Sequence, residues 1–351
     1  MTIYFNHPVE LLGDQLDDYL ANGWFRMGQD IFTCRYLVSA GMLHSAVWLR
    51  RPLADHSFKG SLGKLYRKNQ RLFDICVSPL TITQEKEDLY QRYRAKFKAQ
   101  LSPSIRDSLY EDGRDIYNSY QVEIRKDDRL VAYSIFDIGE NAIQSISGIY
   151  DPEMKRYSLG MTTILAEISY GAQQGFEHYY IGYCAPGNPD FDYKLRLDNL
   201  EFLESMGRQW LPISQLDLAE LPSHRLFRAF SEVESELTKR GIPCRLRLHP
   251  AYRFIVVNKD LRGVFLGDPL FLECHPERFE DHLIYITYDL ERSVYTLYIG
   301  EELPLFKLPV QLLIQNPKGP HVCSRVVKPL CPYGSSRSAT EIATLLKRKE
   351  G

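Results

Sequence analysis

The clearest patterns of apolar and polar positions lie between residues 83 and 183. Thr83 to Ala99 carries apolar residues four apart with basic residues between them, which predicts a helix. Gln121 to Ile138 alternates on both sides of a polar turn and predicts a β-hairpin. A third strand, Ala142 to Tyr150, ends at an Asp-Pro turn. We therefore expect three antiparallel strands in the middle of the chain.

A helix and a buried strand follow these three strands. Ser158 is a candidate N-cap, the apolar residues after it recur at helical spacing, and Gly175 ends the pattern. Phe176 to Tyr183 then reads as a buried strand. This order is that of the central part of an acetyltransferase-like (GNAT) domain, in which two neighbouring strands splay apart and the reaction takes place in the gap. The expected fold is α+β, a GNAT-like core with a mixed sheet and flanking helices.

The flanking regions are less regular. The first fifty residues read as irregular or mixed structure, and a boundary is expected near residues 205–222. Beyond it we expect an amphipathic helix, a β-rich region and a closing helix with a Ser338/Glu341 capping box. The expected elements are Ser223–Arg240 (helix), Tyr252–Asn258, Gly263–Cys274, the hairpin Leu283–Gly300, Pro309–Gln315 (strands) and Ser338–Arg348 (helix). The division is 1–75, an N-terminal region with a basic cluster; 76–205, the GNAT-like transferase core; and 206–351, a β-rich C-terminal extension.

Composition adds one asymmetry to this picture. The chain has 351 residues, 44% of them hydrophobic and 25% charged, as in globular proteins that bury a core. Its net charge is −2, but Arg50 to Lys98 holds twelve Lys and Arg against five Asp and Glu. This locally basic segment fits either contact with phosphates or a solvated helix face.

Other composition features exclude several protein classes. Met1 to Pro8 lacks the basic and apolar regions of a signal peptide, and no run approaches the roughly 20 apolar residues that span a bilayer. The seven cysteines are scattered, without a CxxC pair, as expected of reduced thiols. Cys274-His275 is an isolated doublet, too few ligands for zinc. The prediction is a cytoplasmic protein without membrane contact, metal or cofactor.

Three stretches, in order along the chain, carry the most specific signal. The first, Gly60 to Val77, holds a basic cluster that ends in an Arg-x-Asn motif; the second joins Tyr150-Asp151-Pro152 to Ser158-Leu159-Gly160. The third runs from Tyr179 to Tyr183 and continues to Tyr193-Lys194 and Glu201. Together they resemble the arginyl-tRNA–protein transferase family, including its bacterial leucyl-transferring relatives.

The resemblance implies an enzyme that moves an amino acid from aminoacyl-tRNA to an amine of a protein, peptide or small-molecule acceptor. The aminoacyl ester is already activated, so the enzyme needs no nucleophile. It has to hold the ester beside the amine, help remove a proton and stabilise the oxyanion. The candidate catalytic residues are Lys194, Glu201 and Tyr183. The candidate substrate-binding residues are Ser158, Leu159, Gly160, Tyr193 and Asp190. The candidate tRNA-binding residues are Lys64, Arg67, Lys68 and Arg71.

Each role has a chemical reason and a structural alternative. A helix N-terminus at Ser158 offers backbone N–H groups to a phosphate or a carbonyl oxygen. Glu201 would hold or deprotonate the amine, Lys194 would contact the terminal phosphate or the aminoacyl carbonyl, and Tyr183 and Tyr193 would stack on the terminal adenine. Alternatively, Tyr183 belongs only to a core strand, Glu201 is an edge residue, and the basic cluster is a solvent-exposed segment that leads into a strand.

The chain departs from the family pattern at several places. The cysteine-rich motif of the family is represented only by Cys34, so no metal or iron–sulfur cluster is expected. Asn188, Asp190 and Phe191 stand where the family tends to carry Cys, Lys and Met, and Asn199 replaces a Pro. The last ~145 residues have no recognised counterpart. These departures suggest a divergent member that modifies a special peptide or small molecule.

Two other functions compete with this one. The first is an acyl-CoA-dependent N-acyltransferase on the same scaffold, but Arg156 to Gly160 has only one glycine for a pyrophosphate-binding loop. The second is a non-catalytic RNA- or peptide-binding protein. Mutation of Lys194 and Glu201 distinguishes them, because loss of transfer with intact tRNA binding contradicts a pure binder.

Overall fold

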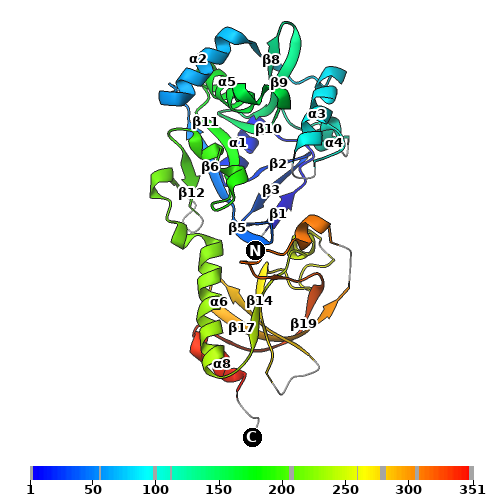
Figure 1. Ribbon diagram of the computed structural model, residues 1–351, viewed down its shortest axis with the longest axis vertical. Coiled ribbons are helices and arrows are strands. Elements are labelled where there is room, and N and C mark those ends of the chain that lie inside the picture. Colours follow the sequence, from blue (N-terminus) through cyan, green and yellow to red (C-terminus); the bar gives the residue numbers. More distant parts are fainter. Residues whose placement is uncertain are drawn as a thin grey trace.

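The chain forms two lobes, one above the other in Figure 1, each built on its own β-sheet. The first described strand, β1 (Ile3–Asn6), lies near the junction of the lobes, and the last described helix, α8 (Ala339–Leu345), lies toward the far end of the lower one (Figure 1). The computed structural model describes residues 3–54, 57–97, 101–110, 113–204, 209–258, 260–276, 282–304 and 308–347.

The upper lobe contains an eight-stranded sheet. Its strands are β6 (Val47–Pro52), β7 (Asp74–Pro79), β8 (Ser119–Lys126), β9 (Arg129–Ile138), β10 (Ala142–Tyr150), β11 (His178–Cys184), β12 (Glu201–Leu203) and β13 (Trp210–Pro212). Their order is β13-β12-β6-β11-β10-β9-β8-β7, and β10–β11 is the parallel pair among antiparallel neighbours. The predicted hairpin, third strand and buried strand are β8–β9, β10 and β11. The expected α+β class with a mixed sheet is confirmed.

Helices cover both faces of this sheet. The helices of the upper lobe are α1 (Gly13–Ala21), α2 (Gly60–Leu72), α3 (Gln84–Lys96), α4 (Ile105–Tyr110) and α5 (Leu159–Gln174). α5 packs on one face together with α2, while α1, α3 and α4 contribute to apolar clusters on the other. The apolar stripe of α5 is buried as predicted, and Gly175 ends the helix with φ +85°. Ser158 makes no side-chain cap, contrary to expectation, because its left-handed backbone (φ 52°) turns the chain into the helix.

The first fifty residues are more regular than their sequence suggests. They form β1 (Ile3–Asn6), β2 (Phe25–Met27), β3 (Asp30–Cys34), β4 (Tyr36–Ser39) and β5 (Met42–Ser45), besides α1 and β6. β1, β3 and β2 make a small sheet, and β4–β5 is a separate hairpin. Strands of three to five residues are too short to show a clear period in a sequence.

The lower lobe contains a six-stranded sheet with the order β18-β14-β15-β16-β17-β19. Its strands are β14 (Cys244–Leu248), β15 (Leu270–Cys274), β16 (Leu283–Asp289), β17 (Val294–Leu303), β18 (His321–Val322) and β19 (Val326–Ser336). Its helices are α6 (Pro222–Lys239), α7 (Tyr252–Val257) and α8 (Ala339–Leu345). The amphipathic helix is confirmed in α6, which buries Phe230, Val233 and Leu237. The hairpin over residues 283–300 is confirmed in β16–β17.

Two predicted strands of the lower lobe are wrong. The run predicted as the strand Tyr252–Asn258 is the helix α7, which buries Tyr252, Ile255 and Val256 at helical spacing. Short apolar runs do not distinguish a buried strand from a buried helix. The segment Pro309–Gln315 contains one 3₁₀ turn at Val310–Leu313. Gly263–Cys274 becomes a strand only at Leu270.

The ends of two predicted helices and the predicted boundary near residues 205–222 are described only in part. Half of the expected capping box forms, because the Ser338 hydroxyl accepts from the Glu341 amide while the Glu341 carboxylate accepts from Ser336. Ala99, Arg348 and Ser205-Met206-Gly207 lie outside the described residues.

The β4–β5 hairpin joins the two lobes. Tyr36, Val38 and Leu43 are buried in the same apolar cluster as α6 and the sheet of the lower lobe. The Tyr252 hydroxyl of α7 donates to the Tyr36 carbonyl at 3.3 Å, and the Asn316 side chain donates to the Ala40 carbonyl at 3.2 Å. The N-terminal part of the chain therefore completes the core of the C-terminal lobe.

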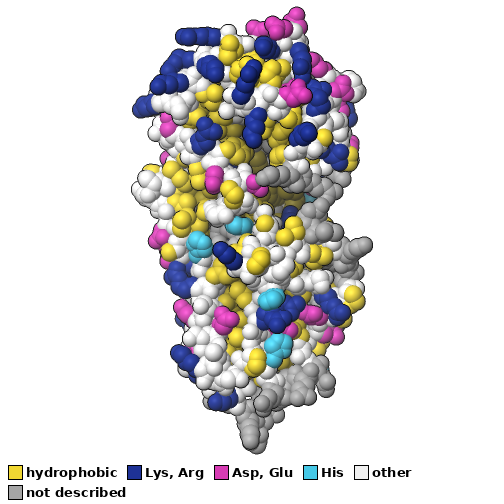
Figure 2. All heavy atoms as spheres, viewed as in Figure 1, with side chains coloured by type: hydrophobic (Ala, Val, Ile, Leu, Met, Phe, Trp, Pro, Cys, Tyr) yellow, Lys and Arg dark blue, Asp and Glu magenta, His cyan; other side chains and the backbone are white. Residues whose placement is uncertain are grey.

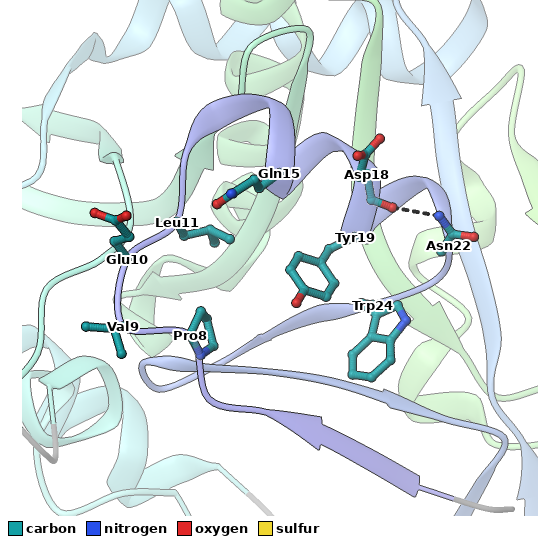
Figure 3. Close-up of a pocket in the computed structure, with 9 residues that line it drawn as sticks. All are labelled: Pro8, Val9, Glu10, Leu11, Gln15, Asp18, Tyr19, Asn22 and Trp24. Atoms are coloured by element: carbon teal, nitrogen blue, oxygen red, sulfur yellow. Dashed lines mark hydrogen bonds between the residues drawn. The ribbon is translucent and has the colours of Figure 1, made fainter.

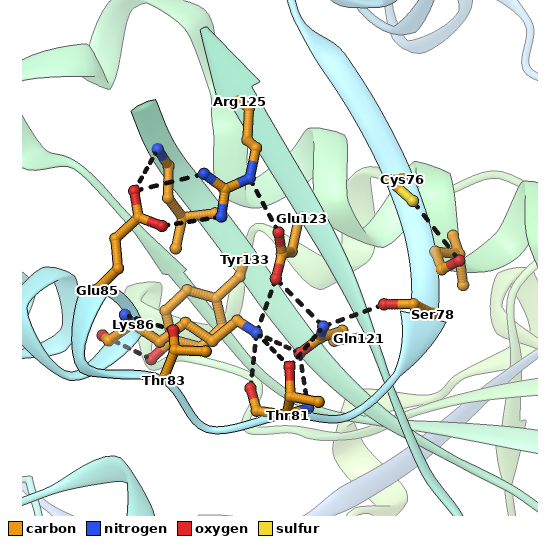
Figure 4. Close-up of polar contacts among 12 residues, drawn as sticks. Cys76, Ser78, Thr81, Thr83, Glu85, Lys86, Gln121, Glu123, Arg125 and Tyr133 are labelled. Atoms are coloured by element: carbon orange, nitrogen blue, oxygen red, sulfur yellow. Dashed lines mark hydrogen bonds and ion pairs between the residues drawn. The ribbon is translucent and has the colours of Figure 1, made fainter. Parts of the chain in front are cut away.

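A buried lysine fixes α3 against the sheet (Figure 4). Lys86, only 1% exposed, places its Nζ 2.6 Å from Gln121 Oε1 and 2.7 Å from Glu123 Oε1 on β8. Glu123 also forms an ion pair with Arg125, and Arg125 forms a second ion pair with Glu85 of α3 at 2.8 Å. A buried charge is tolerated when it is paired and hydrogen-bonded, as here.

Replacing Lys86 by Met is expected to lower the free energy of unfolding by about 3 kcal/mol, because Glu123 and Gln121 lose their shared partner. Urea unfolding of the whole chain measures this loss. Lys96→Met, on an exposed position of the same helix, is the matched control. A loss no larger than that of the control would show that the network does not stabilise the fold.

Candidate functional site

Two central strands of the upper sheet part to form a fork. β10 and β11 pair only where Ala142–Gln144 meets His178–Tyr180. Just beyond this point β10 has a bulge between Ser145 and Ser147, and β11 has one between Tyr180 and Gly182. β-Bulges bend a strand and re-aim its side chains, and they are common beside active sites. Backbone and side chains on both sides of the fork are therefore available to a ligand.

A buried carboxylate lies at the start of this fork. Glu167 of α5 is fully buried and accepts a 2.6 Å hydrogen bond at Oε2 from the Tyr179 hydroxyl. Its other oxygen, Oε1, has no hydrogen-bond partner in the described part of the chain. Burial raises the pKa of Glu167 to about 7, against the opposing effect of the nearby hydroxyls of Ser134, Tyr179 and Ser145. A carboxyl group with this pKa exchanges protons near neutral pH, as a general base does.

Sequence reasoning missed Glu167. The only available signal was a glutamate among the apolar residues of a helix that packs on the sheet. Such a residue is rarely buried without a partner, and it therefore marks a candidate site.

Lys194 lies on the other side of the fork, in the loop after β11. Its Nζ donates to the Tyr183 carbonyl at 2.8 Å and lies within 6 Å of the rings of Tyr183 and Phe191. Burial lowers the pKa of Lys194 to about 8. Gly182 has φ +80°, and a Cβ there would lie 3.2 Å from the Lys194 Nζ. The left-handed glycine thus makes room for the ammonium group.

Tyr193 precedes Lys194 in this loop and lies near Glu167 of α5 and Tyr93 of α3. It is 45% exposed, yet burial of its hydroxyl, and secondly the Glu167 carboxylate, raise its pKa to about 12. Burial, and to a smaller extent Tyr150 and Tyr193, raises the pKa of Tyr93, whose ring packs edge-on against Tyr150 at 5.2 Å. A Cβ at Gly160 would lie 3.3 Å from the Tyr150 ring. Aromatic rings and the start of α5 therefore surround the fork.

The other loop candidates are placed differently. The Tyr183 ring stacks on Phe191 at 5.5 Å and meets Trp48 edge-on at 5.2 Å. Asp190 is exposed on the outer part of the loop, where its amide donates to Asn188 Oδ1. Tyr183 thus supports Lys194, and Asp190 faces solvent.

Glu201 is separate from the fork residues. It lies opposite Arg50 in the β12–β6 register and forms an ion pair with it at 2.7 Å. The Arg50 guanidinium lies 4.6 Å from the centre of the Trp210 ring. The structure brings together Tyr183, Tyr193 and Lys194 and leaves Glu201 with its own partner.

The N-terminus of α5 lies beside the end of β10, one of the two strands of the fork. Ser158 precedes the helix without capping it, Leu159 is fully buried, and the helical hydrogen-bond ladder begins when the Thr162 amide donates to the Ser158 carbonyl. The amides of the first turn point along the helix axis and suit an anion or a developing oxyanion. Gly160 lies beside the Tyr150 ring at this end.

The basic cluster forms one face of the helix α2 and is not an irregular segment that leads into a strand. Lys64, Arg67, Lys68 and Arg71 of α2 are exposed, and their spacing of three, four and seven residues aligns them. The opposite side of α2 packs against α5, because the buried Asn69 donates to Thr162 Oγ1 at 2.6 Å. Figure 2 shows Lys and Arg side chains gathered over α2 at the top of the upper lobe.

This basic face continues to the start of α5. The Lys68 Nζ and the Arg156 Cζ lie 5.8 Å and 4.8 Å from the centre of the Tyr157 ring, respectively. The Tyr157 carbonyl accepts from the Asn69 side chain at 2.8 Å, and Ser158 follows directly. Positive charge thus runs from α2 to the mouth of the fork, as a phosphate backbone requires.

A separate pocket of about 570 Å³ lies beside α1 (Figure 3). It is lined by Pro8, Val9, Glu10, Leu11, Gln15, Asp18, Tyr19, Asn22 and Trp24. None of these residues belongs to the fork or to the basic face. Among the described residues there is no group of three or more His, Cys, Asp or Glu arranged to hold a metal, and no helix long and apolar enough to span a membrane.

Part of the chain is similar in sequence to known proteins. Residues 85–204 match the family model for the C terminus of arginine-tRNA-protein transferase. An aspartate/glutamate leucyltransferase of Leptospira interrogans is 28% identical over 200 residues, 54% of this chain and 75% of that protein. The enzyme of the same name from Acinetobacter baumannii is 29% identical over 46% of this chain and 60% of that protein.

Structure comparisons give weaker similarities. The C-terminal domain of a putative lysylphosphatidylglycerol synthetase from Agrobacterium fabrum has a TM-score of 0.33 at 13% identity, over 54% of this chain and 59% of that one. A GCN5-related N-acetyltransferase from Kribbella flavida has a TM-score of 0.26 at 16% identity, over 45% of this chain and 55% of that one.

Proposed function

We infer that this chain, whose residues 85–204 match the family model for the C terminus of arginine-tRNA-protein transferase, transfers an amino acid from charged tRNA to an amine. The observation that carries the proposal is the fork between β10 and β11, with the buried carboxylate of Glu167 at its start and the basic face of α2 leading to it. A polyanion with a reactive ester at its end fits such a site.

The chemistry can be assigned to groups around the fork. The acceptor nitrogen attacks the ester carbonyl, the bond from nitrogen to carbon forms, and the bond from that carbon to the ribose oxygen breaks. Glu167 takes the proton that leaves the amine, and the ribose oxygen takes up a proton as it departs. The amides at the start of α5 stabilise the oxyanion or hold the terminal phosphate.

Lys194 and Tyr193 have supporting roles in this proposal. The Lys194 ammonium lies beside Gly182 in the fork, where a positive charge stabilises the phosphate or the oxyanion. Tyr193, whose hydroxyl stays protonated, offers an aromatic face to the terminal adenine. Glu201 holds Arg50 and thereby positions β12 against β6. The acceptor is an amine of a polypeptide, and the reaction takes place in the cytoplasm, where charged tRNA is found.

A transfer assay tests the proposal. The purified chain is incubated with total tRNA charged with one labelled amino acid at a time, in an RNA-depleted lysate. Label in an RNase-resistant, acid-stable product is expected for one or a few amino acids. Transfer from none of them, with tRNA binding intact, would indicate a non-catalytic RNA-binding protein. Absence of tRNA binding would contradict the proposal.

A further inference from the structure

A groove runs beside the sheet of the lower lobe, at the edge where β14 is incompletely paired. It has a volume of about 510 Å³ and is lined by residues that include Met42, Phe227, Glu234, Arg245, Lys318 and His321. Its walls come from α6, from the start of β18 and from β5 of the joining hairpin. The groove thus lies where three distant parts of the chain meet.

The floor of the groove is an open strand edge. β14 pairs along its whole length with β15, but β18 covers only Arg247 and Leu248 on the other side. In the described part of the chain Cys244, Arg245 and Leu246 have no strand partner at that edge, and all three line the groove. An unpaired edge offers backbone donors and acceptors to an added strand.

The groove also has a charge preference. Arg245, Lys318 and His321 are exposed, and the described residues supply no ion pair to either Arg245 or Lys318. Glu234 is the one carboxylate among the lining residues. An occupant with acidic side chains complements this surface.

The hairpin connects the groove with the fork. Met42 lines the groove, and two residues further along β5 the His44 Nδ1 lies 3.4 Å from the Pro186 carbonyl, in the loop that continues to Lys194. Two residues of a strand span about 7 Å. A chain that leaves the groove along β5 therefore arrives at the loop that carries Lys194.

We propose that this groove binds an extended, acidic stretch of the acceptor polypeptide, which adds as a strand to the open edge of β14. The stretch holds the acceptor while its amine enters the fork. The inference rests on the proposed function for the identity of the occupant, and it gives the C-terminal lobe a role in choosing the acceptor. Backbone pairing supplies affinity, and Arg245 and Lys318 supply the preference for acidic side chains.

Peptide binding to the full chain without tRNA tests the groove independently of transfer. The probe is a fluorescein-labelled peptide of twelve residues with Asp or Glu at alternate positions, measured by fluorescence anisotropy. The double variant Arg245→Glu/Lys318→Glu is expected to raise the Kd about tenfold or more. Arg228→Glu/Arg292→Glu, on exposed positions elsewhere in the lower lobe, is the matched control. A peptide N-methylated at alternate amides is expected to lose binding, because it cannot pair with an edge.

Several results would overturn the proposal. The proposal fails if the acidic peptide does not bind saturably, or if the groove variant binds it as tightly as the wild type does. It also fails if the N-methylated peptide binds as tightly as the unmodified one. If a twelve-nucleotide RNA displaces the peptide, and this displacement requires Arg245 and Lys318, the groove is a nucleic-acid site instead. In transfer assays the groove variant is expected to raise KM for long acidic acceptors and leave kcat unchanged. Normal peptide binding without transfer would support the groove and count against the proposed enzymatic function.

Discussion

Glu167→Gln is expected to lower kcat for aminoacyl transfer at pH 8 by at least about a hundredfold, because a carboxamide cannot take a proton from the amine. The wild-type rate is expected to rise with pH through about 7, the pKa of Glu167, and the variant is expected to lose that rise. Single-turnover transfer at a series of pH values measures both. Glu177→Gln, on an exposed side chain, is the control.

The same substitution is expected to stabilise the fold above neutral pH. The pKa of Glu167 is about 7 in the folded chain and 4.5 without the effects of folding, so the folded state prefers the protonated form. Its contribution to stability is present below pH 4.5 and is lost as pH rises to about 7. At pH 8 the wild type therefore bears a penalty of about 3 kcal/mol that Gln lacks.

Urea unfolding at pH 5 and pH 8 measures the effect of Glu167→Gln on stability, separately from its effect on the transfer rate. A variant that is more stable at pH 8 but inactive would show that the buried carboxylate is kept for the reaction rather than for the fold. A variant that is less stable at pH 8, or one that retains full activity, would contradict the role assigned to Glu167.

Replacing Lys64, Arg67, Lys68 and Arg71 together by Ala is expected to weaken tRNA binding about a hundredfold or more at 150 mM salt. Four phosphate contacts release about three to four counterions, so the slope of log Kd against log salt should also fall by about three. Filter binding over a range of salt concentrations measures both quantities. At saturating charged tRNA, kcat should be little changed.

The matched control removes four cations from the lower lobe. Arg228, Lys239, Arg292 and Lys328 are at least 40% exposed, and their joint replacement by Ala changes the net charge equally. It should leave the salt slope unchanged. An equal loss of affinity in both variants would show that net charge, and not the face of α2, attracts the RNA.

The central part of the fold was predictable because its elements are long and periodic. The ten-residue strand β9 and the sixteen-residue helix α5 show their spacing clearly. α7 was not predictable, because a segment of six residues, five of them apolar, fits a buried strand as well as a buried turn of helix. The short N-terminal strands pair with neighbours nearby in the sequence, but three to five residues are too few to show a clear period. The helices α6 and α7 that pack against β1, β4 and β5 lie far along the chain, and no local pattern reveals that packing.

The candidate site was predictable to a smaller extent. Motif resemblance led to Lys194 and Tyr193, which the fold does bring to the fork. It did not lead to Glu167, whose importance appears only when burial and the Tyr179 hydroxyl are known. The ion pair of Glu201 was not predictable either, because its partner Arg50 is 151 residues away in the sequence. Long-range pairing of this kind is a property of the fold.

The joining hairpin has a consequence for how the chain is made. Tyr36 and Val38 leave the ribosome early, but the apolar surface that covers them comes from α6 and α7, about two hundred residues later. Until then the hairpin stays exposed, so the final packing of the molecule awaits the end of synthesis. A premature stop codon between β13 and α6 would therefore release a protein with an uncovered apolar hairpin, a substrate for chaperones and proteases.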